Sequence, residues 1–211
     1  MNQRRDEFAR LHRRGDPLFL PNAWDYATAA VLAEAGYPAI GTTSLGVAAA
    51  VGKPDASAAT RDENVQLTRR LASLPVLITV DMESGFSDDP DEVAAVAREL
   101  AEAGAVGVNL EDGRDDGTLS PIELHRAKVA AVHAQVPELF LNARTDTFWL
   151  SPGDGPPPVE ETLRRAAAYV DAGADGIFVP AAAAAEVVAT LSSRTEAPLN
   201  ILYIAGRHTF R

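Results

Sequence analysis

The feature of this sequence that most constrains its fold is a phrase that recurs three times along the chain. Each copy has an acidic residue, Ala-Gly, a short spacer and an apolar run. The copies are LAEAGYPAIGTTS at 32–44, LAEAGAVGVNLED at 100–112 and YVDAGADGIFVP at 169–180. Gly36, Gly104 and Gly173 are predicted to end helices, because glycine adopts the left-handed C-terminal conformation at little cost. The apolar run after each glycine predicts a buried strand.

Further apolar runs extend this alternation over the whole chain. Helices are expected at about 62–71 and 90–100, with another opening at Pro121 and another near Glu160. Seven strands are expected, near residues 18–22, 39–44, 76–83, 107–112, 139–146, 176–180 and 198–204.

Strands that alternate with helices pair in parallel through crossover connections. The pattern favours an α/β fold of the TIM-type (β/α)8 barrel, with an open doubly wound sheet as the alternative. Such a barrel typically needs roughly 250 residues and an eighth strand. With 211 residues and about seven strands, residues 1–211 are expected to form one barrel domain whose last β/α unit is missing.

Composition excludes several classes of function. The formal net charge of −11 disfavours nucleic acid or an anionic membrane as a partner. The chain has no cysteine, which excludes disulfides, thiolate metal sites and a cysteine nucleophile. The start of the chain lacks the apolar segment of a secretory signal, and no apolar run is long enough to span a membrane. A cytoplasmic location is therefore expected.

Polar side chains gather where the predicted strands end. They are Asp81, Glu83, Glu111, Arg144 and Asp146. In a parallel α/β fold these ends meet on one face, where active sites are built. Carboxylates without histidine or cysteine are typical of a site for Mg²⁺, which prefers oxygen ligands.

Structural roles compete with this interpretation. Acidic residues before helices often cap them or lie in solvent, and this is the favoured interpretation for Asp112, Asp115 and Asp116. Arg144 needs an anionic partner, which is either the substrate or a neighbouring carboxylate. Neither lysine, Lys53 nor Lys128, is expected at a strand end, and Lys128 is expected to be exposed, which argues against Schiff-base chemistry.

Five segments together resemble the isocitrate lyase/phosphoenolpyruvate mutase superfamily, in the branch of short phosphoenolpyruvate mutase-like proteins. They are LPNAWDYATAAVLAEAGYPAIGTTSLGVAAAVGKPD at 20–55, PVLITVDMESGF at 75–86, GVNLEDG at 107–113, LNARTD at 141–146 and ETLRRAAAYVDAGADGIFVP at 161–180. The resemblance implies an α/β barrel that forms homo-oligomers, dimers or tetramers, with a helix exchanged between subunits. It also implies Mg²⁺ as cofactor and a small 2-oxo acid or phosphonate as substrate.

The resemblance further implies roles for the strand-end residues. Asp81 would bind the metal directly, whereas Glu83 and Glu111 would act through water. Arg144 would hold the substrate and act in catalysis. Asp55, on the segment that resembles a mobile gating loop, would contact the reacting group.

A second group of residues is expected to surround the substrate. Ser44, Leu45 and Gly46 resemble a loop that holds the substrate carboxylate, and Trp24, with Asp25, would line the pocket.

One departure from the family narrows the activity. The segment after the Glu111 strand, GRDDGTLSPIEL, lacks the cysteine-containing loop of isocitrate and methylisocitrate lyases, which argues against those reactions. The expected function is a Mg²⁺-dependent C–C or P–C lyase, hydrolase or mutase that proceeds through an enolpyruvate-type intermediate. The alternatives are a non-catalytic barrel that binds metal or oxo acid, and a class II aldolase-like metal enzyme.

Overall fold

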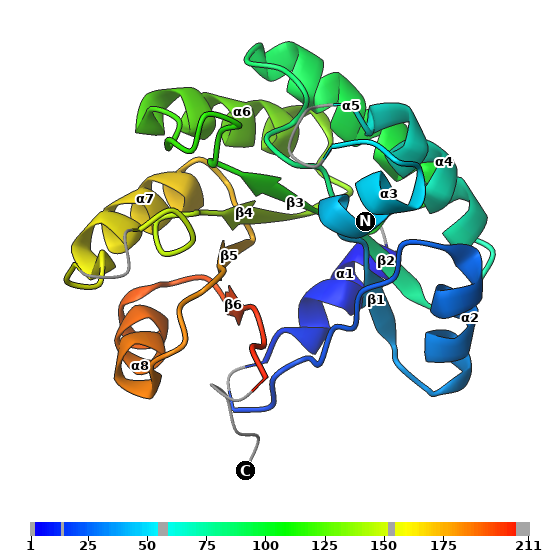
Figure 1. Ribbon diagram of the computed structural model, residues 1–211, viewed down its shortest axis with the longest axis horizontal. Coiled ribbons are helices and arrows are strands. Elements are labelled where there is room, and N and C mark those ends of the chain that lie inside the picture. Colours follow the sequence, from blue (N-terminus) through cyan, green and yellow to red (C-terminus); the bar gives the residue numbers. More distant parts are fainter. Residues whose placement is uncertain (1–2, 14, 55–58, 152–154, 206–211) are drawn as a thin grey trace.

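The computed structural model describes residues 3–13, 15–54, 59–151 and 155–205. Its centre is a curved sheet of six parallel strands, surrounded by an outer arc of helices (Figure 1). The strands are β1 (Ala39–Gly41), β2 (Leu77–Asp81), β3 (Gly107–Glu111), β4 (Phe140–Arg144), β5 (Gly176–Val179) and β6 (Leu199–Ile201). The helices are α1 (Gln3–Leu11), α2 (Tyr26–Glu34), α3 (Ser44–Ala50), α4 (Arg61–Leu71), α5 (Pro90–Ala103), α6 (Ile122–Gln135), α7 (Val159–Asp171) and α8 (Ala185–Arg194). None of the described helices is long and apolar enough to cross a membrane.

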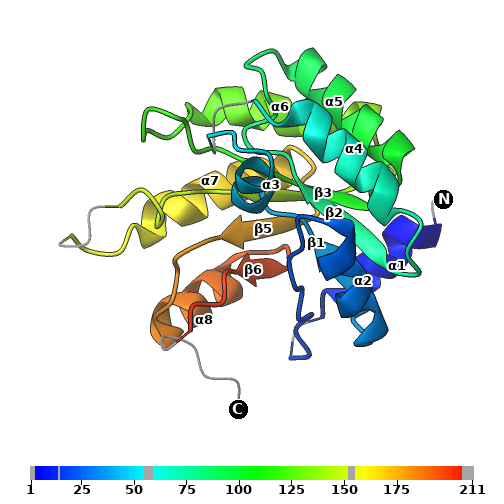
Figure 2. The same ribbon diagram turned by 45° about the vertical axis from the view of Figure 1, so that its right-hand side comes forward.

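The order of the strands distinguishes between the two folds expected from the sequence. Each strand pairs in parallel with the next one along the chain, from β1 to β6, without a reversal of order. In a doubly wound sheet the order of the strands would reverse at a switch point. The sheet instead curls into a half-barrel, as Figure 2 shows from a second angle. The expected TIM-type architecture, incomplete in this chain, is confirmed.

The first of the seven expected strands is not a strand of this sheet. Residues 18–22 approach β1, but only Asn22 forms an isolated parallel bridge, to Gly41. Pro17 and Pro21 lack backbone N–H groups, so the segment cannot donate a regular ladder of hydrogen bonds. Gly41 permits the close approach, because a Cβ there would lie 2.6 Å from Asn22 Oδ1.

Helix α5 illustrates how local sequence directs the elements. Asp89 caps the helix by accepting a hydrogen bond from the Asp91 N–H (2.9 Å), and Pro90 occupies the first helical position. The helix ends at Gly104, whose φ is +110°. Gly36 and Gly173 also have positive φ, +89° and +103°, so all three predicted helix-ending glycines are confirmed.

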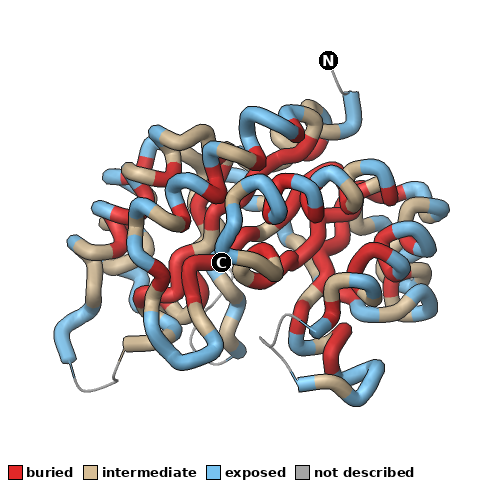
Figure 3. The backbone as a smooth tube through the Cα atoms, turned by 90° about the horizontal axis from the view of Figure 1, so that it is seen from above, coloured by how far each residue is buried: buried red, intermediate tan, exposed pale blue. Residues whose placement is uncertain are grey.

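Helix α1, which the sequence patterns did not predict, covers the amino-terminal end of the sheet. Phe8 is buried against the first residues of the strands, in a cluster with Ala39, Leu77, Val106 and Phe140. The His12 ring stacks on Phe140 with centroids 4.5 Å apart. Burial is concentrated along the strands and the inward helix faces (Figure 3). The amino-terminal end is thus packed, and the carboxyl-terminal end remains for a site.

Candidate active site at the carboxyl ends of the strands

A cavity of about 270 Å³ lies at the carboxyl ends of the strands. Six of the residues predicted for the site line it: Ser44, Leu45, Asp81, Glu83, Glu111 and Arg144. Asp146 lines it as well. The structure therefore brings together side chains from four successive β-strand ends, as the parallel arrangement requires.

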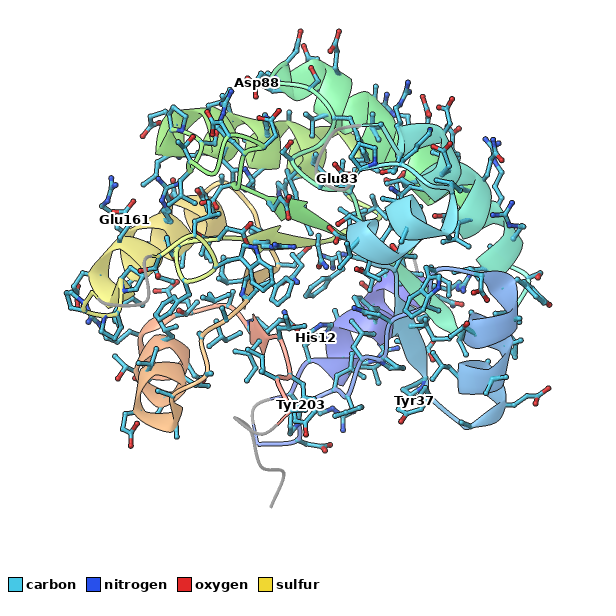
Figure 4. The ribbon with its side chains drawn as sticks, in the orientation of Figure 1. His12, Tyr37, Glu83, Asp88, Glu161 and Tyr203 are labelled. Carbon is cyan, nitrogen blue, oxygen red and sulfur yellow. The ribbon has the colours of Figure 1, made fainter. Side chains whose placement is uncertain are left out.

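Asp81 and Glu83 project from the end of β2 and are almost fully buried. Asp81 Oδ2 accepts a hydrogen bond from the Ser44 N–H (3.2 Å), and Glu83 Oε1 accepts one from the Thr60 hydroxyl (2.6 Å). Glu83 has a φ of +51°, a left-handed conformation that is uncommon for a residue with a long side chain. Such strain clusters at functional sites, because the surrounding structure must hold it. Figure 4 shows Glu83 between α3 and the outer arc of helices.

Arg144 at the end of β4 is held by two carboxylates. Its Nε and Nη2 atoms donate to Asp146 at 2.6 and 3.1 Å, and its Nη1 atom lies 2.8 Å from Glu111 Oε2. The guanidinium also lies 5.6 Å from the centre of the Phe178 ring. Arg144 is thus paired with neighbouring carboxylates, the structural alternative expected from the sequence, and its side chain also lines the cavity.

The cavity carries more negative than positive charge. Burial raises the pKa of Glu111 to about 9; Arg144 opposes this shift, whereas Asp81, Asp146 and Glu83 add to it. Burial likewise raises the pKa of Asp146, against the effect of Arg144. Arg144 offsets part of this effect through its 2.8 Å pair with Glu111, but the residues that line the cavity still include more acidic than basic side chains.

The donor chemistry of the cavity fits a hard divalent cation. Asp81, Glu83 and Glu111 supply only oxygen atoms, and a cation would offset the repulsion among them. Within the described part of the chain, however, no three carboxylate or histidine side chains form a ready-made metal cage. Glu83 and Glu111 are turned toward Thr60 and Arg144, an arrangement that suits contact through water, which Mg²⁺ retains readily.

Trp24, Asp25 and Gly46 are not among the described residues that line the cavity. Trp24 does not belong to the described cavity lining; its ring packs over Gly46, where an added Cβ would lie 2.8 Å from a ring carbon. Gly46 therefore serves close packing within this region. Asp25 caps α2 by accepting a hydrogen bond from the Thr28 N–H (2.7 Å). Asp55 lies outside the described residues.

Asp112, next to Glu111, belongs to a buried network on the other side of β3. Its carboxylate accepts hydrogen bonds from Arg165 (2.9 Å), Tyr169 (2.7 Å), Thr145 (2.9 Å) and the Asp146 N–H (2.9 Å). The preferred structural role of Asp112 is supported, although it lies in the interior and not in solvent. Its network positions the strand end that carries Arg144 and Asp146.

The expectation that Lys128 is exposed is wrong. Its side chain is only 2% exposed, and its Nζ donates to the Ser84 carbonyl (3.1 Å) and to Asp88 (3.0 Å). The helical position alone did not reveal this burial, because the loop before α5 folds over α6.

Several lining residues were missed by the sequence patterns. They are Asn22, Thr42, Asn109, Trp149, Phe178 and Leu202. Asn109 and Asn142 are hydrogen-bonded across β3 and β4 (2.8 Å), and Asn200 donates to Asn142 (2.9 Å). An asparagine with apolar neighbours on both sides in each of three strands was the signal that could have identified this polar row.

Comparison with known proteins adds to this geometry. Residues 8–211 match the phosphoenolpyruvate phosphomutase family. An uncharacterized protein of Mycobacterium tuberculosis is 42% identical over 199 residues, covering 94% of this chain and 74% of the relative. The chain belongs to the phosphoenolpyruvate phosphomutase family. Another relative, the 2-methylisocitrate lyase of Bacillus subtilis, is 32% identical over 91% of this chain and 64% of its own length.

Solved structures of the family share the architecture. A Burkholderia cenocepacia protein named as a phosphonomutase superposes with a TM-score of 0.92 at 35% identity, over 97% of this chain and 84% of that one. A phosphonopyruvate hydrolase, solved with oxalate and Mg²⁺, gives a TM-score of 0.81 at 25% identity, over 94% of this chain and 71% of that one. The superfamily membership expected from the sequence is therefore confirmed, and its members include lyases, mutases and hydrolases.

Proposed function

We propose that this protein is a Mg²⁺-dependent enzyme that acts on a small 2-oxo acid or phosphonate through an enolate-type intermediate. The reaction class is C–C or P–C bond lyase, hydrolase or mutase. The observation that carries the proposal is the convergence of three strand-end carboxylates and Arg144 in one cavity. The 2-methylisocitrate lyase and the phosphonopyruvate hydrolase with oxalate and Mg²⁺ support it by similarity.

The carboxylates would hold the cation. Asp81 would bind it directly, and Glu83 and Glu111 would contact it through water. When bound, a divalent cation stabilises the negative charge that develops on the enolate oxygen of a 2-oxo acid. The cluster of acids in the cavity, which together with burial raises the pKa of Glu111, is the feature of this chain that favours cation binding.

The remaining residues would orient the substrate. Ser44 and Leu45 line the cavity beside Asp81, where the Ser44 side chain and the local backbone would hold the substrate carboxylate. Arg144 would bind the substrate with the N–H groups that Asp146 and Glu111 do not occupy. Asp55 is assigned to the reacting group by the family resemblance.

Oxalate binding tests the proposal, because oxalate mimics a planar enolate. Calorimetry with and without Mg²⁺ should show binding that depends on the metal and disappears in Asp81→Asn. Asp62→Asn is the matched control, because Asp62 is an exposed residue in the first turn of α4. Failure of the folded wild-type protein to bind oxalate with Mg²⁺ would refute the proposed site.

A substrate screen then separates an enzyme from a non-catalytic barrel. Phosphonopyruvate, oxaloacetate and alkyl-substituted malates, incubated with Mg²⁺, should yield a product for at least one compound. Binding of oxalate without turnover of any compound would favour the non-catalytic alternative. We also propose a cytoplasmic homo-oligomer, dimer or tetramer, which sedimentation analysis would test.

A further inference from the structure

Arg114 lies at the boundary between the site cavity and a second cavity of about 210 Å³. Both cavities are lined by Ser84, Glu111, Gly113, Arg114 and Asp115, so they share a wall. Arg114 lies three residues after the end of β3, in the segment that lacks the cysteine-containing loop of isocitrate and methylisocitrate lyases.

We infer that Arg114 is a specificity-determining residue that binds a second anionic group of the substrate, a carboxylate or a phosphonate. The inference rests on the proposed function. Among the described residues that line the site cavity, two are cationic, Arg114 and Arg144. Asp146 and Glu111 already compensate the charge of Arg144. A substrate with a second acid group needs another cation, and Arg114 supplies it.

The backbone holds Arg114 in place at the rim. Gly113 and Leu119 form an antiparallel bridge, and the Arg114 N–H donates to the Thr118 carbonyl (2.9 Å). Between them, the Gly117 N–H donates to the Arg114 carbonyl (3.0 Å). These bonds make the segment a short hairpin. Its start packs tightly against the site, because a Cβ on Gly113 would lie 2.4 Å from Asp146 Oδ2.

The Arg114 side chain can leave its present partner at little cost. Its ion pair with Asp88 is long, 3.4 Å, and the two side chains are 35% and 59% exposed. Exposed pairs of this kind contribute little to stability. Asp88 would remain compensated, because the buried Lys128 donates to it at 3.0 Å. Figure 4 shows Asp88 at the outer edge of the molecule, on the loop before α5.

The chemistry of the side chain matches the proposed ligand. A guanidinium presents paired N–H donors that fit a carboxylate or a phosphonate, and such charge-assisted bonds are stronger than neutral ones. Asp115 contributes an opposing negative charge on the same rim. The balance between Arg114 and Asp115 should therefore set how strongly a second acid group is preferred.

The test compares two ligands by calorimetry in the presence of Mg²⁺. Oxalate consists only of the part that mimics the planar enolate and its carboxylate. By contrast, 3,3-difluorooxaloacetate carries a further carboxylate beyond that part. Arg114→Gln should weaken the binding of difluorooxaloacetate about 10-fold or more and change the affinity for oxalate less than about 2-fold. Arg114→Lys should retain part of the affinity that Arg114→Gln loses, and Asp115→Asn should strengthen the binding of difluorooxaloacetate. Arg98→Gln, which removes an exposed arginine of α5, should change neither ligand. Repeating the titration with phosphonopyruvate distinguishes a preference for phosphonate from one for carboxylate.

The outcomes separate this inference from the proposed function. Metal-dependent oxalate binding together with unchanged difluorooxaloacetate binding in Arg114→Gln would overturn the role of Arg114 and leave the enolate site standing. Equal weakening of both ligands would also overturn it, because a specificity residue must discriminate between them. Failure of the folded wild-type protein to bind oxalate in the presence of Mg²⁺ would refute the site itself. Thermal unfolding of Arg114→Gln serves as the check that the variant is folded.

Discussion

Arg144 Nη1 lies 2.8 Å from Glu111 Oε2, and this pair joins the ends of β3 and β4 at the floor of the cavity. The pair is largely buried, with side chains 14% and 10% exposed. Asp146 binds the same guanidinium from the other side. One cation therefore serves several buried acids, and the surplus of negative charge is the physical basis for the proposed metal site.

Replacing Glu111 by Gln tests this surplus. Burial and the neighbouring acids raise the pKa of Glu111 despite its pair with Arg144, so holding its negative charge in the fold is unfavourable in the absence of a metal cation. We expect Glu111→Gln to unfold in metal-free buffer at the same temperature as the wild type or higher, while losing most of the stabilisation by Mg²⁺. For the wild type, Mg²⁺ at about 100 times its Kd should add roughly 2.7 kcal/mol.

Thermal melts with and without Mg²⁺ measure this change, and Glu123→Gln on α6 is the matched control because Glu123 is exposed. If Glu111→Gln kept the full stabilisation by Mg²⁺, Glu111 would have no part in metal binding.

Asp112 should prove structural. Asp112→Ala would leave Arg165, whose side chain is 8% exposed, without its buried carboxylate partner. We expect the free energy of unfolding to fall by about 3 to 5 kcal/mol, the usual cost of breaking a buried ion pair. Urea unfolding measures it, with Asp116→Ala as the control because Asp116 lies on the exposed hairpin. A loss below about 1 kcal/mol would contradict the structural role.

His125 should make the protein less stable in acid. The ring is fully buried, and its pKa is lowered to about 4, mainly by burial and also by Lys128 and Arg165, against the opposing effect of Asp112. Between the ordinary value of 6.5 and about 4, the unfolded chain binds a proton that the folded one does not. The free energy of unfolding therefore falls as the pH falls through this range, by about 3 kcal/mol in total from this group.

The measurement is urea unfolding at a series of pH values from 7.5 to 4. His125→Leu should show a shallower decline than the wild type, because this proton uptake is removed. His12, whose pKa burial also lowers, remains in both proteins and contributes equally. Parallel pH curves for the two proteins would count against a neutral, buried His125.

Phe8 should stabilise the fold without touching the chemistry. Phe8→Ala removes a ring that is 2% exposed from the cluster under the sheet, which typically costs about 3 to 5 kcal/mol. Oxalate binding with Mg²⁺ should persist at temperatures where the variant is folded, because the cavity lies at the opposite end of the strands. Unfolding and calorimetry on the same sample provide both readings. A large loss of affinity in the folded variant would show that the two ends are coupled.

The sequence by itself determined the architecture and most of the candidate site. The helix-ending glycines and the apolar runs follow from local backbone preference and periodicity, which act within a few residues. Parallel alternation then places all strand ends on one face. For that reason Asp81, Glu83, Glu111 and Arg144 could be brought together in prediction without any knowledge of tertiary contacts.

Only the tertiary structure decided which side chains turn toward the cavity and which are consumed by packing. Trp24, which was expected to line the pocket, packs over Gly46 instead, and Lys128, which was expected to be exposed, is buried beneath the loop before α5. Residues 18–22 form only one isolated bridge to the sheet, and this outcome depends on how Pro21 packs beside β1. Likewise, the place of Arg114 between two cavities depends on Gly113 packing against Asp146. Such contacts join residues distant in the chain, and local sequence preference carries no information about them.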